Sequence, residues 1–170
     1  YGHQMLGPRT VSLLSERARF LAVNTQANAA NTGFHTISKY PRADFVSLAE
    51  RELQLECRSQ SGDLREQLKE VGDRLQTKTI VVTLGKRGCL CYDRESGFHQ
   101  AESLATNVVD RIGAGDAFFA ISSLCAALGA PVEVLSFLGN VAGAEAVAIV
   151  GNSRSVDESS FRRHVASLFK

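Results

Sequence analysis

Apolar and polar positions alternate along this chain in a pattern that predicts strands and helices following one another. Short apolar runs bounded by polar or turn-forming residues predict buried strands, and apolar residues recurring every three or four positions predict amphipathic helices. The predicted strands are 20–23, 44–48, 79–84, 89–92 and 98–101. The predicted helices are 11–20, one that opens at 49, 63–75, 117–128, 132–150 and 157–169. The alternation as far as residue 129 favours an α/β fold with a mainly parallel sheet, flanking helices and a helical C-terminus.

The last two predicted helices differ in how much of their surface is apolar. Helix 132–150 carries only Glu133 and Glu145 as charged residues, which predicts that it is largely buried. Helix 157–169 is amphipathic, and its expected inward side chains are Phe161, Val165, Leu168 and Phe169.

Two glycines lie where a predicted strand turns into a predicted helix. The two valines at 108–109 predict the end of a buried strand, and the almost wholly apolar run 117–128 predicts a buried helix. Gly113 and Gly115 fall between these elements, and Asp116 falls in the first turn of the helix.

This turn has the composition of an anion site. The first N–H groups of a helix have no internal partner, and glycine lets the backbone approach an anion closely. We expect Gly113, Ala114 and Gly115 to bind a phosphate or the charge that develops during phosphoryl transfer. Asp116 would then accept the proton of an attacking hydroxyl. The alternative is an ordinary strand–helix turn in which Asp116 only complements the helix dipole.

Two other glycine motifs are excluded by single residues. A dinucleotide-binding motif needs a third glycine, but position 118 is Phe. A P-loop needs Ser or Thr after Gly-Lys, but Gly85-Lys86 is followed by Arg87, and position 80 is Ile.

Composition narrows the class of protein. With 170 residues, 44% hydrophobic and 22% charged, the chain is long enough for one globular domain with a core. A net charge of +1 argues against a nucleic-acid partner, and the apolar run 117–128 is too short to span a membrane. The four cysteines, Cys57, Cys89, Cys91 and Cys125, have no metal-binding spacing. We therefore expect free thiols and a cytoplasmic location.

The stretch Asp-Arg-Ile-Gly-Ala-Gly-Asp-Ala-Phe, residues 110–118, resembles the signature D-T-x-G-A-G-D-x-F of ribokinase-like (PfkB) carbohydrate kinases. The resemblance implies that the Gly113–Gly115 backbone forms an anion hole and that Asp116 is the catalytic base. Arg111 stands where the family usually has Thr.

Further residues match the nucleotide-binding positions of this family. The resemblance implies contacts to ATP from Asn24, Thr83, Gly85, Gly88 and Asn140. Thr83 is equally typical of a β-branched strand residue, and Asn140 of an interhelical hydrogen bond. For Asn24 we favour contact with the nucleotide phosphates.

Two acidic residues match metal positions of the family. Residues 49–53 resemble its N-x-x-E motif, with Glu52 as the Glu but Ala49 in place of Asn. The resemblance implies that Glu52 helps to place Mg²⁺, and the alternative is an exposed acid favoured by the helix dipole. Asp110, together with the loop that begins at Gly151, would by the same resemblance hold a monovalent cation such as K⁺.

The resemblance implies ATP-dependent phosphoryl transfer to a hydroxyl of a sugar or sugar phosphate. Because Ala49 and Arg111 depart from the family pattern, a catalytically inactive nucleotide-binding or interaction module is the alternative. Family members are nearly twice this length, so we expect residues 1–170 to form one α/β domain without a lid, the C-terminal half of a longer kinase. It would pair with an N-terminal half or form a homo-oligomer. Residues 1–3 and 24–33 resemble kinases of heptose phosphates.

Overall fold

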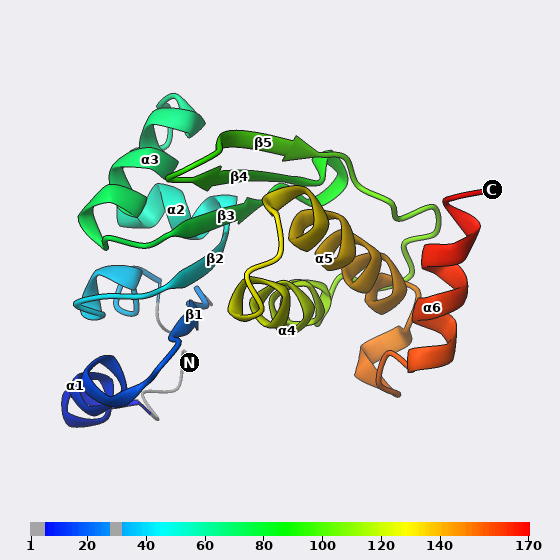
Figure 1. Cartoon of the computed structure of the whole chain (residues 1–170), viewed down its shortest axis with the longest axis horizontal. Helices are drawn as coiled ribbons and strands as arrows, with labels where there is room; N and C mark the ends of the chain where they lie inside the picture. Colours follow the sequence, from blue (N-terminus) through cyan, green and yellow to red (C-terminus); the bar gives the residue numbers. More distant parts are fainter. Residues whose placement is uncertain (1–5, 28–31) are drawn as a thin grey trace. The chain divides into compact units, whose positions relative to one another are not determined.

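A computed structural model describes residues 6–27 and 32–170, which form strands and helices in alternation followed by a run of helices (Figure 1). The strands are β1 (Ala22–Asn24), β2 (Phe45–Ala49), β3 (Thr79–Thr83), β4 (Cys89–Asp93) and β5 (Gly97–Ala101). The helices are α1 (Pro8–Arg17), α2 (Glu50–Glu56), α3 (Leu64–Arg74), α4 (Ala114–Ala127), α5 (Val132–Val147) and α6 (Glu158–Ser167). Short 3-10 turns are η1 (Ile37–Lys39), η2 (Gly85–Arg87) and η3 (Val150–Asn152). The chain has two compact units, one of Tyr1–Thr83 with Leu90–His99 and one of Leu84–Cys89 with Gln100–Lys170.

The five strands form one sheet in the order β1-β2-β3-β4-β5. Strands β1, β2 and β3 are parallel, with Asn24 opposite Ser47 and Ala49 opposite Thr83. Figure 1 shows β4 running opposite to its two neighbours. The predicted α/β fold with a mostly parallel sheet and flanking helices is therefore confirmed. Because β1 to β3 are parallel, their carboxyl ends lie at one edge of the sheet.

The core of the first unit follows from its uninterrupted apolar strands. Val46, Ile80 and Val82 are fully buried, as expected of parallel strands covered on both faces. Helices α2 and α3 pack against β2, β3 and each other. Asp63 caps α3 by accepting a hydrogen bond of 2.7 Å from the N–H of Arg65.

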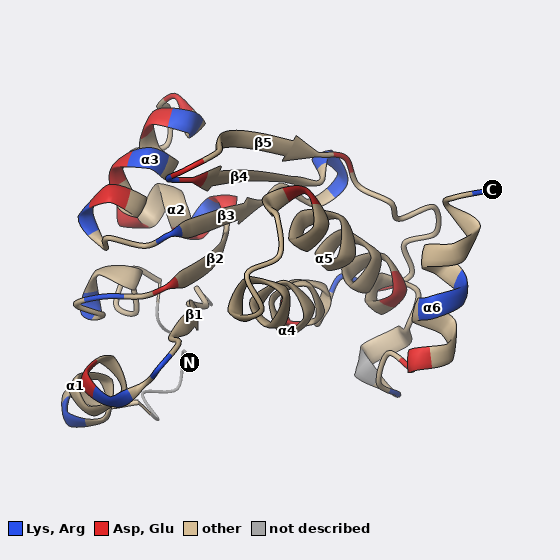
Figure 2. Cartoon of the chain, viewed as in Figure 1, with Lys and Arg blue, Asp and Glu red and all other residues tan. Residues whose placement is uncertain are grey.

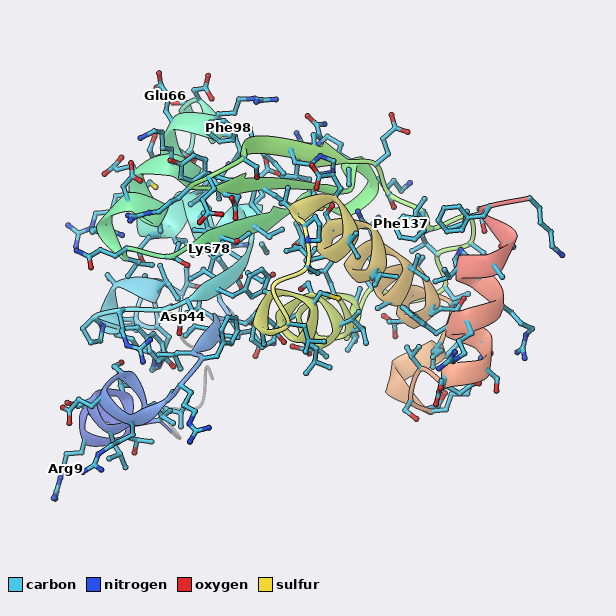
Figure 3. The ribbon with its side chains drawn as sticks, viewed as in Figure 1. Arg9, Asp44, Glu66, Lys78, Phe98 and Phe137 are labelled. Carbon is cyan, nitrogen blue, oxygen red and sulfur yellow. The ribbon has the colours of Figure 1, made fainter. Side chains whose placement is uncertain are left out.

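A polar cluster fastens the C-terminus of α1 to the start of β2. Arg42 donates to the carbonyl oxygens of Ser15 (2.7 Å) and Ala18 (2.6 Å) and to the Asp44 carboxylate (2.8 Å). The same Asp44 oxygen accepts the N–H of Leu21 at 2.6 Å, and Figure 3 shows Asp44 beside these elements. The guanidinium thus satisfies helix-end carbonyl groups that have no partner within the helix.

The second unit is built on two helices that carry almost no charge. Figure 2 shows α4 and α5 nearly free of Lys, Arg, Asp and Glu. They approach closely because Gly139 has no side chain: a Cβ there would lie 2.8 Å from the Phe118 ring. Most of the buried residues of this unit lie on α5, as its sequence predicted. None of the helices in the described part of the chain is both long and apolar enough to span a bilayer.

Helix α6 and the residues after it contact α5 through a polar and an aromatic pair. His164 Nδ1, on α6, lies 2.7 Å from Glu145 Oε1. Beyond the end of α6, the Phe169 ring meets the ring of Phe137 edge to face, with centroids 5.7 Å apart; Phe137 is labelled in Figure 3. The expectation that Leu168 and Phe169 face inward was wrong, since they are 42% and 78% exposed. The reason is that α6 ends at Ser167, so both residues lie beyond its amphipathic face.

Two further sequence predictions were wrong. No strand forms at 108–109: Val109 is 51% exposed, and its N–H donates to the carbonyl oxygen of Val147 (2.8 Å) instead of to a sheet. Helix α4 is not buried throughout, because one face packs on α5 while Leu124 and Leu128 are 61% and 87% exposed. In both segments the apolar composition predicted that the residues would be buried, but tertiary contacts cover only part of each segment.

Candidate functional site

The start of α4 is set by the backbone conformation of Gly113. This residue is the N-cap, with φ 82° and ψ −7°, a left-handed conformation that glycine adopts at little cost. The chain reverses there, and the helix begins at Ala114. The carbonyl oxygen of Gly113 accepts the N–H of Ala117 at 2.9 Å, which closes the first helical turn.

The N–H groups within this first turn remain available to a ligand. The N–H of Ala114 makes one long hydrogen bond, 3.4 Å, to the carbonyl oxygen of Arg111. The N–H groups of Gly115 and Asp116 make no hydrogen bond with any residue that the structure describes. Open donors at a positively polarised helix end form a site for an anion.

The side chains of this turn leave its surroundings open. A Cβ added to Gly115 would meet no atom within 4 Å, and its φ lies outside the left-handed region. Neither packing nor backbone conformation therefore requires glycine at this position. The carboxylate of Asp116 is exposed and has no hydrogen bond or ion pair to the described residues, so both of its oxygens are open.

Asp110 fastens this turn to the segment that follows α5. One carboxylate oxygen accepts the N–H of Ile112 (3.0 Å), and the other accepts the N–H of Gly151 (2.9 Å). The hydrogen bonds from Ile112 and Gly151 hold the pKa of Asp110 below its ordinary value. The sequence did not reveal this bridging contact, and the monovalent cation at Asp110 stays a prediction.

Asn140 has a partner that the sequence did not suggest. Its side-chain Nδ2 lies 3.5 Å from the Sγ of Cys89, at the start of β4. The alternative of an interhelical hydrogen bond was therefore wrong, because the neighbouring polar atom belongs to a strand. Cys89 and Cys91 are buried free thiols, and Cys57 and Cys125 are partly exposed free thiols.

The two glycines at the ends of η2 both have a positive φ, but their surroundings differ. Gly88 has φ 78°, and a Cβ on it would lie 2.0 Å from the carbonyl oxygen of Ala101. Its carbonyl oxygen accepts the N–H of Leu84 at 2.8 Å. Gly85 has φ 59° with open space around it. Glycine at 88 is thus required by the fold itself, while at Gly85 only the positive φ favours glycine and the space beside it is open.

At the carboxyl edge of the parallel strands, two predicted nucleotide contacts end β1 and β3, the strands on either side of β2. Asn24 is the last residue of β1; it is half-buried, and its amide makes no hydrogen bond with the described residues. Thr83 ends β3, and its hydroxyl donates a long hydrogen bond, 3.4 Å, to the carbonyl oxygen of Leu48. This edge is where open α/β sheets bind their ligands.

Glu52, in the first turn of α2, holds two backbone N–H groups. Its Oε2 accepts the N–H of Ala49 at 2.7 Å, and its Oε1 accepts the N–H of Ala27 at 3.0 Å. Ala49 is the N-cap of α2 and offers no side-chain oxygen of its own. The contact with Ala27, in the loop after β1, could not be inferred from the sequence.

The sequence of residues 5–158 matches the pfkB family carbohydrate kinase. The chain belongs to this family. No match was found among curated protein sequences.

The fold is also that of solved kinases of the family. Phosphofructokinase-2 from Escherichia coli in complex with potassium is 21% identical with a TM-score of 0.78, and the match covers 96% of this chain and 52% of that chain. Ribokinase from Thermotoga maritima is 16% identical with a TM-score of 0.76, covering 92% and 52%. Ribokinase from Arabidopsis thaliana, complexed with ribose and ATP, is 19% identical with a TM-score of 0.74, covering 93% and 51%. The chain thus spans about half the length of these structures.

The described residues offer no cage of protein side chains for a magnesium ion. Mg²⁺ needs an octahedron of oxygens and is usually bound through carboxylates, waters and substrate phosphates. No group of three or more His, Cys, Asp or Glu side chains suited to a metal lies among residues 6–27 and 32–170. At the N-x-x-E position there is one carboxylate, Glu52, and both of its oxygens accept backbone N–H groups.

The predicted site residues form two groups, one in each unit. Asn24, Glu52 and Thr83 lie at the carboxyl edge of the parallel strands, in the first unit. The second unit contains Gly85, Gly88, Asp110, Gly113, Ala114, Gly115, Asp116 and Asn140. The loop likeness to heptose-phosphate kinases rests partly on residues 1–3 and 28–31, which lie outside the described residues.

A separate cavity of about 490 Å³ lies in the first unit, and its described lining includes none of the predicted site residues. The start of α1 lines it together with His35 and Lys39. Burial lowers the pKa of Lys39. The Nε2 atom of His35 is buried and has no hydrogen-bond partner in the described structure.

Proposed function

We propose that this PfkB family chain belongs to an ATP-dependent kinase that transfers a phosphoryl group to a hydroxyl of a sugar or sugar phosphate. One observation carries the proposal. The open N–H groups of Gly115 and Asp116 stand at the start of α4, and the exposed carboxylate of Asp116 belongs to the same turn. An anion site and a free base within one helical turn are what phosphoryl transfer to an alcohol requires.

The chemistry follows from the donors and the acceptor in that turn. The Asp116 carboxylate takes the proton of the acceptor hydroxyl while the hydroxyl oxygen bonds to the γ-phosphorus and ADP leaves. The N–H groups of Gly115 and Asp116 stabilise negative charge on the oxygens of the transferred group. These N–H groups are already oriented by the helix, so little reorganisation accompanies the reaction.

For the first unit, the proposed nucleotide contacts are Asn24 and Thr83, which end strands at the carboxyl edge of the sheet. For the second unit they are Gly85, which leaves its surroundings open, and Asn140. Asn140 is half-buried and engaged with the Cys89 sulfur. The complex of the Arabidopsis ribokinase with ribose and ATP supports ATP as the donor.

The test is the Asp116→Asn variant of the protein, assayed for ADP release from MgATP with a panel of sugars and sugar phosphates. We expect the transfer rate to fall by about 10²- to 10⁴-fold, the usual contribution of a general base. ATP affinity should stay within a few-fold of wild type, because the N–H donors remain. Glu133→Gln, an exposed acid in the first turn of α5, is the matched control. Wild-type transfer by Asp116→Asn would overturn the assignment.

A second candidate is a nucleotide-binding module that does not catalyse. Ala49 favours it, because this position offers no side-chain oxygen where the family motif has Asn. Calorimetry with MgATP separates the two functions: binding without turnover of any acceptor in the panel supports the module, and turnover excludes it.

A further inference from the structure

We propose that Glu52 is a positioning residue, which ties the loop after β1 to the start of α2, and is not a direct ligand of Mg²⁺. The tie itself is independent of function. Its effect on nucleotide affinity rests on the function proposed above.

The tie consists of two hydrogen bonds to one carboxylate. Oε2 accepts the N–H of Ala49 (2.7 Å), within the same turn, and Oε1 accepts the N–H of Ala27 (3.0 Å), from a distant part of the sequence. Hydrogen bonds from N–H groups to an ionised carboxylate are about twice as strong as those between neutral groups. A capping box has two reciprocal hydrogen bonds, one from the N3 backbone to the N-cap side chain and one from the N-cap backbone to the N3 side chain. Because Ala49 has no side-chain acceptor, only the second forms here, with Glu52 as the acceptor.

The same contacts disfavour a metal at this carboxylate. Each carboxylate oxygen has two lone-pair sites, and here a backbone N–H occupies one of them on each oxygen and places positive charge beside any cation bound at the other. On the side facing the loop, Glu52 borders a cavity of about 10 Å³ together with Thr25, Ala27 and Thr36. That volume holds about one water, whereas Mg²⁺ usually keeps several.

The tie acts on a segment next to a proposed nucleotide contact. Ala27 follows Asn24, the last residue of β1, by three positions, so its hydrogen bond restrains the backbone on which the Asn24 side chain is presented. Without the bond, nucleotide binding would have to order this segment, and affinity would fall. The prediction is therefore a loss of nucleotide affinity that does not depend on magnesium.

The experiment compares wild type with Glu52→Gln, Glu52→Asp and the control Glu66→Gln. Glu66 is an exposed first-turn acid of α3, so its variant removes the same charge from the same position of a helix. Amide exchange at Ala27 and Ala49 is followed by NMR, and ADP affinity is measured by calorimetry in EDTA and in Mg²⁺. In Glu52→Gln one acceptor oxygen becomes an NH₂ group, and the shorter Glu52→Asp side chain cannot reach both N–H groups.

In Glu52→Asp we expect exchange at Ala27 to accelerate by roughly tenfold or more, as for loss of a hydrogen bond to a charged group. In Glu52→Gln the remaining oxygen keeps only one of the two N–H groups, so exchange should accelerate at Ala27 or at Ala49. ADP affinity should fall by a similar factor in EDTA and in Mg²⁺, and Glu66→Gln should match wild type. Unchanged exchange at Ala27 in Glu52→Asp, or an affinity loss confined to Mg²⁺, would overturn the proposal. If wild type binds no nucleotide, the proposed function fails, while the exchange measurement still decides whether the tie exists.

Discussion

Replacing Gly115 by Ala separates the stability of α4 from its proposed anion site. The added Cβ meets no atom within 4 Å, and Gly115 has no left-handed φ that alanine would have to adopt. Alanine in a helix is favoured over glycine by roughly 0.5–1 kcal/mol, because glycine loses more conformational freedom on folding. Gly115→Ala should therefore raise the free energy of unfolding by up to that amount.

The same substitution should impair phosphoryl transfer. Its methyl group would stand beside the open N–H groups of Gly115 and Asp116 and hold the phosphoryl oxygens away from them. Loss of one such donor lowers catalytic rates by about 10²- to 10³-fold in other enzymes, which is the scale we expect here. Gly113→Ala is the contrasting variant: with φ 82° at this residue, it should lose about 1–2 kcal/mol of stability.

Both quantities are measurable on the same protein preparations. Urea unfolding gives the change in stability, and ADP release with the acceptor panel gives the change in rate. A more stable Gly115→Ala protein with wild-type transfer would refute the anion site, since the glycine would then have no chemical purpose. A destabilised Gly115→Ala protein would refute the open surroundings on which the reasoning depends.

Three further predictions concern stability. Gly88→Ala should lower the free energy of unfolding by about 3 kcal/mol or more, because strain at its positive φ adds to overpacking of a Cβ placed 2.0 Å from the Ala101 oxygen. Urea unfolding measures this loss. Arg42→Ala should lower the free energy of unfolding by about 2 kcal/mol, because carbonyl groups at the end of α1 and the Asp44 carboxylate lose a charged donor. Thermal unfolding measures this loss. Burial raises the pKa of Asp93, but hydrogen bonds from neighbouring hydroxyl and N–H groups outweigh it and lower the pKa overall. The stability that Asp93 contributes is therefore present above the unfolded-state pKa of about 3.9 and is lost as pH falls through the folded-state pKa, so Asp93→Asn should flatten the acid limb of stability against pH.

Each of these has a control. Gly85→Ala has the strain of a positive φ without the clash, so equal losses for Gly85→Ala and Gly88→Ala would contradict the close approach at Gly88. Arg9→Ala, an exposed residue of α1 shown in Figure 3, should be neutral; a loss equal to that of Arg42→Ala would point to helix charge instead of capping. An unchanged acid limb in Asp93→Asn would mean that other carboxylates govern it.

Elements with strong local signals were predictable from the sequence. The run 79–84 is apolar and β-branched, and β3 forms there with its central residues fully buried. Asp63 precedes an amphipathic run and caps α3 as such residues do. The valines at 108–109 have the same local character as a strand. The N–H groups of Val109 and Asp110 nevertheless donate to the carbonyl oxygen of Val147 at the end of α5, a contact that no local pattern reveals.

The candidate site was predictable in part for the same reason. The glycine–helix turn and its acid are contiguous in sequence, so their geometry follows from helix physics. The partners of Glu52, Asp110 and Asn140 are Ala27, Gly151 and Cys89, each far away along the chain. Such contacts exist only once the chain has folded.

By itself, then, the sequence determined the α/β class and the turn at Gly113–Asp116, because periodicity, glycine conformation and open helix-end N–H groups act over a few neighbouring residues. Only the tertiary structure decided how the two carboxylates predicted as metal ligands are used. Glu52 and Asp110 both accept backbone N–H groups that folding brings to them. Spacing shows which acids could bind a ligand, but the competing donors around each acid are set by packing between distant segments.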